Sequence, residues 1–382
     1  MRHTYMFDTG RRGVTEARDF FEAGPRPLVP AREVCWNSDR MDIFMRLAIL
    51  WLALLSTAHS HVPDEWPTSA PGRQGLDADQ FASPDAHIRT ELPHVRSLLI
   101  ARHGALVFER YYGDASREEP HDILSMTKSV TSALVGIALK KGLISSLDNR
   151  VAGYFPEYAP GMVDDRLKSV TIRHLLTMTS GLDEMGLNFD HGVEDLTAEI
   201  LKLRLAAAPG AGFRYSSPAA HLLGGVLRKA SGHGVLAFAE AELFRPLGIG
   251  KVIWYGDKTG LQSGGMSALF RSRDLLKLGE LYLRRGKRNG RELISPAYIA
   301  DSVTVHSTGD FYGERVRYGY LWWITSAGGQ DAYYARGYGG QYLMVLPGAD
   351  LVVLCTSDWK QPEYPEHFAI VEKRILPALT SR

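Results

Sequence analysis

Two β-hairpin patterns lie far apart in this chain and enclose a long segment with helical patterning. The first pattern joins apolar runs at 94–102 and 105–112 through a His-Gly dipeptide. The second joins runs at 342–346 and 351–354 through the turn sequence Pro-Gly-Ala-Asp. Apolar runs around short turns of this kind predict β-hairpins. We therefore expect strands from both ends of the domain to share one antiparallel sheet.

The segment between the hairpins carries longer helical patterns, at 128–141, 222–230 and 273–285. Together the patterns predict an α+β fold, in which helices flank the sheet and a mainly helical lobe is inserted between its strands. The chain has 382 residues. Single hydrophobic cores stop growing at roughly 250–300 residues, so we expect two lobes with a site between them.

An apolar run near the N-terminus has the composition of a secretory leader. Residues 47–55 read LAILWLALL, follow Met45-Arg46 and precede the small-residue sequence Ala-His-Ser. A basic start, a short apolar core and a small-residue cleavage site make up a signal peptide, and this run is too short to span a bilayer. We expect a signal peptide at 41–60, cleavage after Ser60, a periplasmic or secreted protein and no stable transmembrane span.

The position of this leader, 40 residues into the chain, needs its own explanation. Residues 1–40 are expected to be a disordered extension or a mis-assigned start, with translation beginning at Met41 or Met45. A buried helix within the domain is the alternative interpretation of the apolar run. Residues 61–90 are rich in Pro, Ser, Asp and Gly, which predicts a linker, so the folded domain is expected at 91–382.

Composition argues against several classes of function. The 44 basic and 43 acidic residues nearly balance, so nothing favours a nucleic-acid partner. The two cysteines, Cys35 and Cys355, form no CxxC pair and no Cys/His cluster with metal-ligand spacing. We therefore expect no metal and no cofactor. The G-x-S-x-G elbow of α/β-hydrolases does not occur either.

A first catalytic pattern is the S-x-x-K sequence at 125–128, which is followed by a buried-helix pattern. On a helix, Lys128 lies one turn above Ser125 on the same face. A desolvated lysine can take the proton of a serine hydroxyl, and a helix N-terminus favours developing negative charge. The motif alone is weak, because about one or two copies are expected by chance. A helix cap followed by a solvated lysine is the alternative.

The sequence around this motif resembles the β-lactamase-like serine hydrolases. The similarity rests on SMTKSV at 125–130, GLISSLD at 142–148 and VTIRHLLTMTSGL at 170–182, and it covers roughly residues 97–377. This family includes class C β-lactamases, D-alanyl-D-alanine carboxypeptidases, esterases and 6-aminohexanoate-dimer hydrolases. The resemblance implies a β-lactamase-like fold with Ser125 as the catalytic nucleophile.

The family's Y-x-N motif corresponds to Tyr215-Ser216-Ser217. The resemblance implies that Tyr215 accepts a proton together with Lys128 and later protonates the leaving group. Ser217 replaces the usual Asn, and its hydroxyl can bond the lysine but lacks the paired donor and acceptor of an amide. A core aromatic residue is the alternative interpretation of Tyr215.

The family's third motif, K-T-G, has two candidates in this chain. The literal match at 258–260 lies in a turn-rich stretch, and we expect it to be false because the motif must lie on a strand beside the serine. The better candidate is Ala-Arg-Gly at 335–337, just before the second hairpin. There Ala335 stands where the family has Lys or His. A simple hairpin turn is the alternative.

The resemblance implies two further kinds of role. The backbone N–H groups of Ser125 and Tyr338 would form the oxyanion hole. The substrate would contact Ser217, Arg336, Gly337 and Gly339.

The resemblance implies a serine hydrolase that cleaves a small-molecule ester, amide or peptide-like substrate through an acyl-enzyme. The pattern at 335–341 is more similar to the esterase and 6-aminohexanoate-dimer hydrolase branch than to the β-lactamases. A β-lactamase or D-Ala-D-Ala carboxypeptidase is the alternative within the family, with Arg336 as a possible carboxylate ligand. A catalytically inactive binding or sensing relative is the alternative of another class.

Overall fold

The computed structural model describes residues 66–183, 192–360 and 367–380, all of which belong to one structural unit. The predicted extension at 1–40 and the predicted leader at 41–60 lie outside the described residues. Within the described ranges, no helix is both long enough and apolar enough to cross a membrane.

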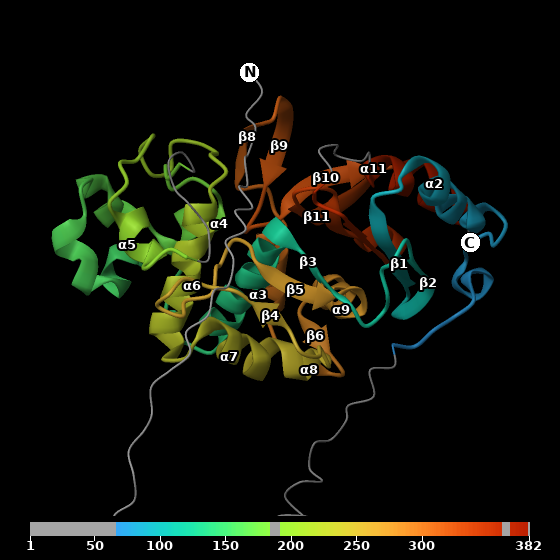
Figure 1. Ribbon diagram of the computed structural model, residues 1–382, viewed down its shortest axis with the longest axis horizontal. Coiled ribbons are helices and arrows are strands. Elements are labelled where there is room, and N and C mark those ends of the chain that lie inside the picture. The colour runs from blue at the N-terminus through green and yellow to red at the C-terminus, as the bar shows by residue number, and fades with distance from the viewer. Residues whose placement is uncertain (1–65, 184–191, 361–366, 381–382) are drawn as a thin grey trace, which may run out of the picture. The chain divides into compact units, whose positions relative to one another are not determined.

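Strands from both ends of the described chain form one eight-stranded antiparallel sheet (Figure 1). The first predicted hairpin is β1 (Val95–Arg102) with β2 (Ala105–Tyr111), and the second is β12 (Gln341–Leu346) with β13 (Leu351–Ser357). Strands β1 and β13 pair directly. The prediction of a shared antiparallel sheet is therefore confirmed.

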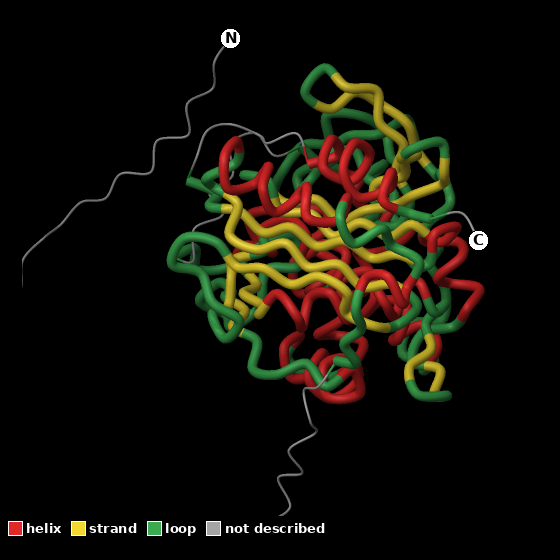
Figure 2. The backbone as a smooth tube through the Cα atoms, turned by 90° about the vertical axis from the view of Figure 1, so that its right-hand side faces the viewer, coloured by secondary structure: helices red, strands yellow, loops and turns green. Residues whose placement is uncertain are grey.

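The other half of the sheet was not predicted in detail from the sequence. In the order β2-β1-β13-β12-β11-β10-β9-β8, its last four strands are β11 (Gln330–Gly337), β10 (Trp323–Ala327), β9 (Glu314–Tyr318) and β8 (Ser307–Phe311). Helices lie on both faces of the sheet (Figure 2). Coverage of both faces explains why most residues of β12 and β13 are apolar, since every residue in these two strands is buried.

The segment between β2 and β8 in the sequence contains the three predicted helices. They are α3 (Thr127–Lys140), α6 (Ser217–Ser231) and α9 (Ser272–Leu283). Shorter helices in the same part of the chain are α4 (Ile172–Leu176), α5 (Leu196–Leu201), α7 (Val235–Ala239), α8 (Arg245–Leu247) and α10 (Pro296–Ser302). The α+β fold class is confirmed. Helix α3 is buried throughout residues 127–138 and contacts both α6 and β11.

A small three-stranded sheet, in the order β3-β5-β4, lies in the same part of the chain. Its strands are β3 (Pro120–Asp122), β4 (Ile253–Trp254) and β5 (Ala268–Arg271). Strand β3 ends two residues before the turn that carries Ser125, so this sheet fixes the approach to that serine.

The prediction of a linker at 61–90 is wrong for its described part, residues 66–90. Trp66, Leu76 and Phe81 are buried in the core, and the indole N–H of Trp66 donates to Gly104 O at 3.0 Å. The segment continues into helix α2 (Ser83–Glu91). Its prolines and glycines form turns and a helix start, where such residues are favourable, so the folded domain begins before residue 91.

Candidate active site

Ser125 lies in the 3-10 turn Leu124–Met126, which leads directly into α3. Leu124 has a φ of 48°, in the left-handed region, and its N–H donates to Asp122 Oδ1 at 2.8 Å. A bulky residue is strained in this conformation, and backbone strain of this kind is concentrated at functional sites. The turn places Ser125 at the N-terminal end of a buried helix, as the sequence predicts.

Lys128 lies one turn further along the chain, and its side chain is almost completely buried. Its Nζ donates to Ser125 Oγ at 3.0 Å, to Ser217 Oγ at 3.0 Å and to Gly265 O at 2.9 Å. Three acceptors match the three N–H groups of an ammonium ion. The structure therefore brings Ser125, Lys128 and Ser217 together, and the alternative of a solvated lysine is wrong.

Tyr215 precedes α6, whose N-cap Ser216 accepts the N–H of Ala219. The Tyr215 ring lies 4.8 Å from Lys128 Nζ, measured to the ring centroid, in a cation–π arrangement. Its other neighbours are aromatic, since Trp323 stacks on it at 5.5 Å and Phe311 lies at 4.9 Å. Tyr215 thus joins the charged part of the site to an aromatic cluster formed by Phe213, Tyr215, Phe311, Tyr318 and Trp323.

The sequence at 335–337 forms the end of strand β11, as the third motif requires. A Cβ atom on Gly337 would lie only 2.5 Å from Ile123 O, two residues before Ser125. This glycine therefore lets the end of β11 press against the turn that carries the serine. Tyr338 follows as the first residue of the turn, and the φ of Gly339 is 69°, which favours glycine.

Arg336 is less available to a substrate than the sequence suggests. Its guanidinium lies 5.7 Å from the Phe311 ring centroid, and its Nη1 lies 3.6 Å from Glu314 Oε2. A cation in this position is partly neutralised by the carboxylate. Ala335 beside it is buried.

The literal K-T-G sequence is not part of this site. Lys258 lies in a turn, its side chain is 54% exposed, and its Nζ donates to Glu194 at 2.5 Å. The expectation that this match is false is therefore supported by its position in the fold.

One element of the site, at residues 264–265, was not predicted from the sequence. Gly265 supplies the backbone oxygen that Lys128 binds. The neighbouring Gly264 packs against α6, since a Cβ atom there would lie 2.1 Å from Ala220 O. The pair of adjacent glycines was the available signal, because such a pair allows close backbone packing.

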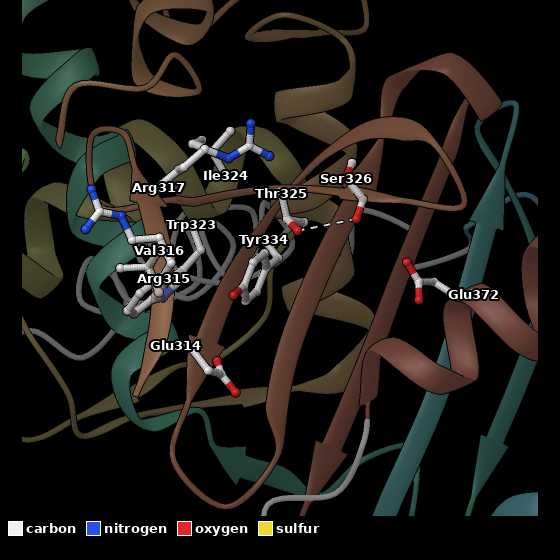
Figure 3. A pocket seen from close by; sticks show the side chains of 10 residues that line it. All are labelled: Glu314, Arg315, Val316, Arg317, Trp323, Ile324, Thr325, Ser326, Tyr334 and Glu372. Carbon is white, nitrogen blue, oxygen red and sulfur yellow. Dashed lines mark hydrogen bonds between the residues drawn. The ribbon is translucent and has the colours of Figure 1, made fainter. Parts of the chain in front are cut away.

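A pocket of about 280 Å³ opens beside the aromatic cluster (Figure 3). It is lined by parts of β9, β10 and β11 and by Glu372, with Trp323 shared between the pocket and the cluster. Ser125, Lys128 and Tyr215 are not among its lining residues. The pocket is therefore a neighbour of the candidate catalytic residues and does not contain them.

Metal-ligand clusters and cysteine are two other kinds of reactive group that the described part of the chain could offer. Among the residues that the structure describes, no three His, Cys, Asp or Glu side chains are grouped as metal ligands. Cys355 is buried in β13, and burial raises the pKa of its thiol to about 12. Cys355 is therefore a packing residue.

Comparison with known proteins identifies the family. The family model described as Beta-lactamase matches residues 94–372, which is most of the chain. The chain belongs to the beta-lactamase family. The family that the sequence motifs suggest is therefore confirmed.

Relatives within the beta-lactamase family include esterases and hydrolases. The chain is 33% identical over 175 residues to esterase EstB from Burkholderia gladioli, a match that covers 40% of this chain and 44% of the esterase. It is 23% identical over 319 residues to 6-aminohexanoate-dimer hydrolase from Paenarthrobacter ureafaciens, covering 75% of this chain and 79% of that protein.

Solved structures show the same fold. A putative 6-aminohexanoate-dimer hydrolase from Bacillus anthracis is similar with a TM-score of 0.68 and 18% identity, covering 82% of this chain and 86% of that chain. A family VIII carboxylesterase is similar with a TM-score of 0.66 and 19% identity, and the match covers 80% of this chain and 98% of the carboxylesterase chain. The predicted β-lactamase-like fold is confirmed.

Proposed function

We propose that this protein is a serine hydrolase that cleaves carboxylic esters or amides through an acyl-enzyme on Ser125. The observation that carries the proposal is the buried Lys128 Nζ, which lies 3.0 Å from Ser125 Oγ at the start of α3. The presence of esterases and an amide hydrolase among its relatives supports the same chemistry. The substrate is a small molecule, and an ester or linear amide is favoured over a β-lactam.

The proposed reaction begins with attack on the substrate carbonyl. Lys128, in its neutral form, takes the proton from the Ser125 hydroxyl while Oγ bonds to the carbonyl carbon. The N–H groups of Ser125 and Tyr338 stabilise the negative charge that develops on the carbonyl oxygen. Tyr215 donates its phenolic proton to the departing alcohol or amine as that group's bond to the carbonyl carbon breaks, and it takes up the proton that Lys128 holds. A water molecule then attacks the Ser125 ester and gives a proton to Lys128. That proton passes to Ser125 Oγ as the ester bond breaks, which releases the acid and restores the hydroxyl.

Replacement of three residues tests this function directly. With p-nitrophenyl butyrate as substrate, Ser125→Ala should abolish hydrolysis, because the variant lacks the hydroxyl on which the proposed acyl-enzyme forms. Lys128→Ala and Tyr215→Phe should each lower the acylation rate by at least ~10²-fold, the usual contribution of an acid–base group. A fluorophosphonate probe followed by peptide mass spectrometry should locate the label on Ser125 alone.

Two further variants serve as comparisons. Lys258→Ala alters the literal K-T-G sequence on the surface and should keep the full rate. Ser217→Ala should lower the rate less than Lys128→Ala, since Lys128 keeps its contacts with Ser125 and Gly265. Full activity in Ser125→Ala would contradict Ser125 as the nucleophile. A wild-type protein that neither hydrolyses the ester nor takes up the probe would favour the catalytically inactive binding or sensing relative.

We also propose that the protein is exported to the periplasm or the medium through the signal peptide at 41–60. This proposal rests on the basic, apolar and small-residue segments of that sequence. Expression in a Gram-negative host should give a mature N-terminus at His61. A cytosolic protein that retains residue 41 would contradict the proposal.

A further inference from the structure

Three successive backbone carbonyls, at residues 263–265, are each bound by a different side chain. Ser263 O accepts the indole N–H of Trp254 at 2.8 Å, and Gly264 O accepts the Thr131 hydroxyl at 2.8 Å. Gly265 O accepts Lys128 Nζ at 2.9 Å. We name residues 263–265 the acceptor loop. Trp254, Thr131 and Lys128 are all buried, so these bonds are shielded from competing water.

The last of these carbonyls constrains the proposed base. A carbonyl oxygen can only accept, so Gly265 always takes one N–H of Lys128, whatever the protonation state of the amine. A neutral amine has two N–H groups and one lone pair. If its second N–H goes to Ser217 Oγ, the lone pair faces Ser125 Oγ, as removal of the serine proton requires. The position of the acceptor loop therefore determines whether the lone pair of Lys128 Nζ faces Ser125 Oγ.

Helix α3 holds both the lysine and the loop. Lys128 and Thr131 are three residues apart and thus lie on one face of α3, where each binds one of two adjacent carbonyls. On its other side the loop rests on α6, because a Cβ atom at Gly264 would lie 2.1 Å from Ala220 O. The loop has no room to shift toward α6. Backbone bonds join Tyr255 to Ser263 and Ser267 at the ends of this segment, and between them the Thr131 and Trp254 side chains hold the carbonyls in place.

We infer that Thr131 and Trp254 are positioning residues for the proposed reaction: through the acceptor loop they hold Gly265 O on Lys128 and so aim its lone pair at Ser125. This inference rests on the proposed serine-hydrolase function and assigns to that reaction two residues that touch neither Ser125 nor the substrate. Thr131 acts through Gly264, and Trp254 acts through Ser263.

Substitution of Thr131 gives the decisive measurement. Thr131→Val keeps the shape of the side chain and removes the donor, which leaves Gly264 O without its bond and frees the loop. We expect kcat for p-nitrophenyl butyrate to fall about tenfold with little change in KM, because a small misplacement of a reacting group is costly. The acid limb of the pH–rate profile should move to lower pH by about half a unit, because losing an acceptor disfavours the protonated amine.

Matched variants separate this effect from a general loss of packing. Thr127→Val is the control on the same helix, since the Thr127 hydroxyl is buried and has no hydrogen-bond partner in the described structure. Thr127→Val should keep the wild-type kcat and the wild-type pH–rate profile. Thr131→Ser retains the hydroxyl and should restore both the rate and the acid limb. Trp254→Phe removes the second donor and should change both quantities in the same direction as Thr131→Val.

The outcomes distinguish this inference from the function beneath it. If Ser125→Ala is as active and as readily labelled as the wild type, the proposed function fails. If Ser125 is essential but Thr131→Val and Trp254→Phe keep the wild-type kcat and acid limb, the positioning role alone is wrong. If Thr127→Val lowers kcat as much as Thr131→Val does, the positioning role is also wrong. If circular dichroism shows that Thr131→Val does not fold, Trp254→Phe tests the inference instead, through kcat and the acid limb of the pH–rate profile.

Discussion

Arg336, at the scale of single residues, is the candidate cation for an anionic substrate. Its guanidinium lies over the Phe311 ring and 3.6 Å from the Glu314 carboxylate. Ala335 occupies the place where the resemblance leads us to expect a cation, and Ser217 replaces an amide. A β-lactam needs a cation for its carboxylate, whereas a neutral ester does not. The proposed preference for neutral substrates rests on these residues.

We predict that kcat/KM for p-nitrophenyl butyrate exceeds that for a chromogenic cephalosporin. Glu314→Gln should raise the cephalosporin value up to about fivefold without changing the ester value, because it releases Arg336 from an exposed ion pair of roughly 0–1 kcal/mol. Asp331→Asn is the control, since it removes one exposed negative charge from the same sheet. A higher kcat/KM for the cephalosporin in the wild type would favour the β-lactamase alternative.

The contacts of Lys128 show which parts of the site the sequence could predict. Its contact with Ser125 follows from helix geometry over three residues, so the spacing alone predicts it. Its contact with Gly265 joins residues 137 positions apart and uses a backbone oxygen, which every residue type has. Pattern analysis could find the first contact but not the second. The left-handed conformation of Leu124 likewise has no signature in the sequence.

At the scale of elements, the contact between the end of β11 and the serine turn controls the proposed oxyanion hole. Gly337 makes this contact possible because a Cβ atom would lie 2.5 Å from Ile123 O. The sequence predicted this strand from its place beside the second hairpin. The sequence did not predict β8. This strand lies at the edge of the sheet and its residues are all partly buried or exposed, so it lacks the continuous apolar run that would have identified it.

We predict that Gly337→Ala lowers kcat about 10²-fold, because β11 must move away from the serine turn and the Tyr338 N–H moves with it. Rates for p-nitrophenyl butyrate, measured with the thermal unfolding midpoint, test this prediction. Gly153→Ala is the matched control, since a Cβ atom there would have no neighbour within 4 Å. Equal kcat values in the two variants would show that the β11 contact does not affect catalysis.

Over the whole molecule, burial overrides local composition in two places. The polar, proline-containing segment at 66–90 predicts a linker, yet Trp66, Leu76 and Phe81 pack into the core. Three apolar side chains widely spaced in a polar sequence give no periodic pattern, so only the folded structure reveals their role. The second case is His221, a polar residue that is completely buried on α6, where Thr197 Oγ1 lies 3.4 Å from its Nε2.

Burial of His221 links the stability of the whole domain to pH. Desolvation lowers the pKa of His221 from 6.5 to about 4, and its Nδ1 has no hydrogen-bond partner in the described structure. Since the unfolded chain binds the proton more readily, this histidine favours folding less as the pH falls from 6.5 toward 4. Between pH 7 and pH 5 the expected loss is about 2 kcal/mol in the free energy of unfolding.

Urea unfolding at these two pH values, followed by circular dichroism, measures that loss. His221→Gln removes the titrating group, so its free energy of unfolding should fall by about 2 kcal/mol less than that of the wild type between pH 7 and pH 5. His233→Gln removes an exposed histidine and should leave the wild-type pH dependence unchanged. If His221→Gln loses as much stability as the wild type, other groups govern the acid sensitivity. In that case the buried histidine does not link protonation to folding.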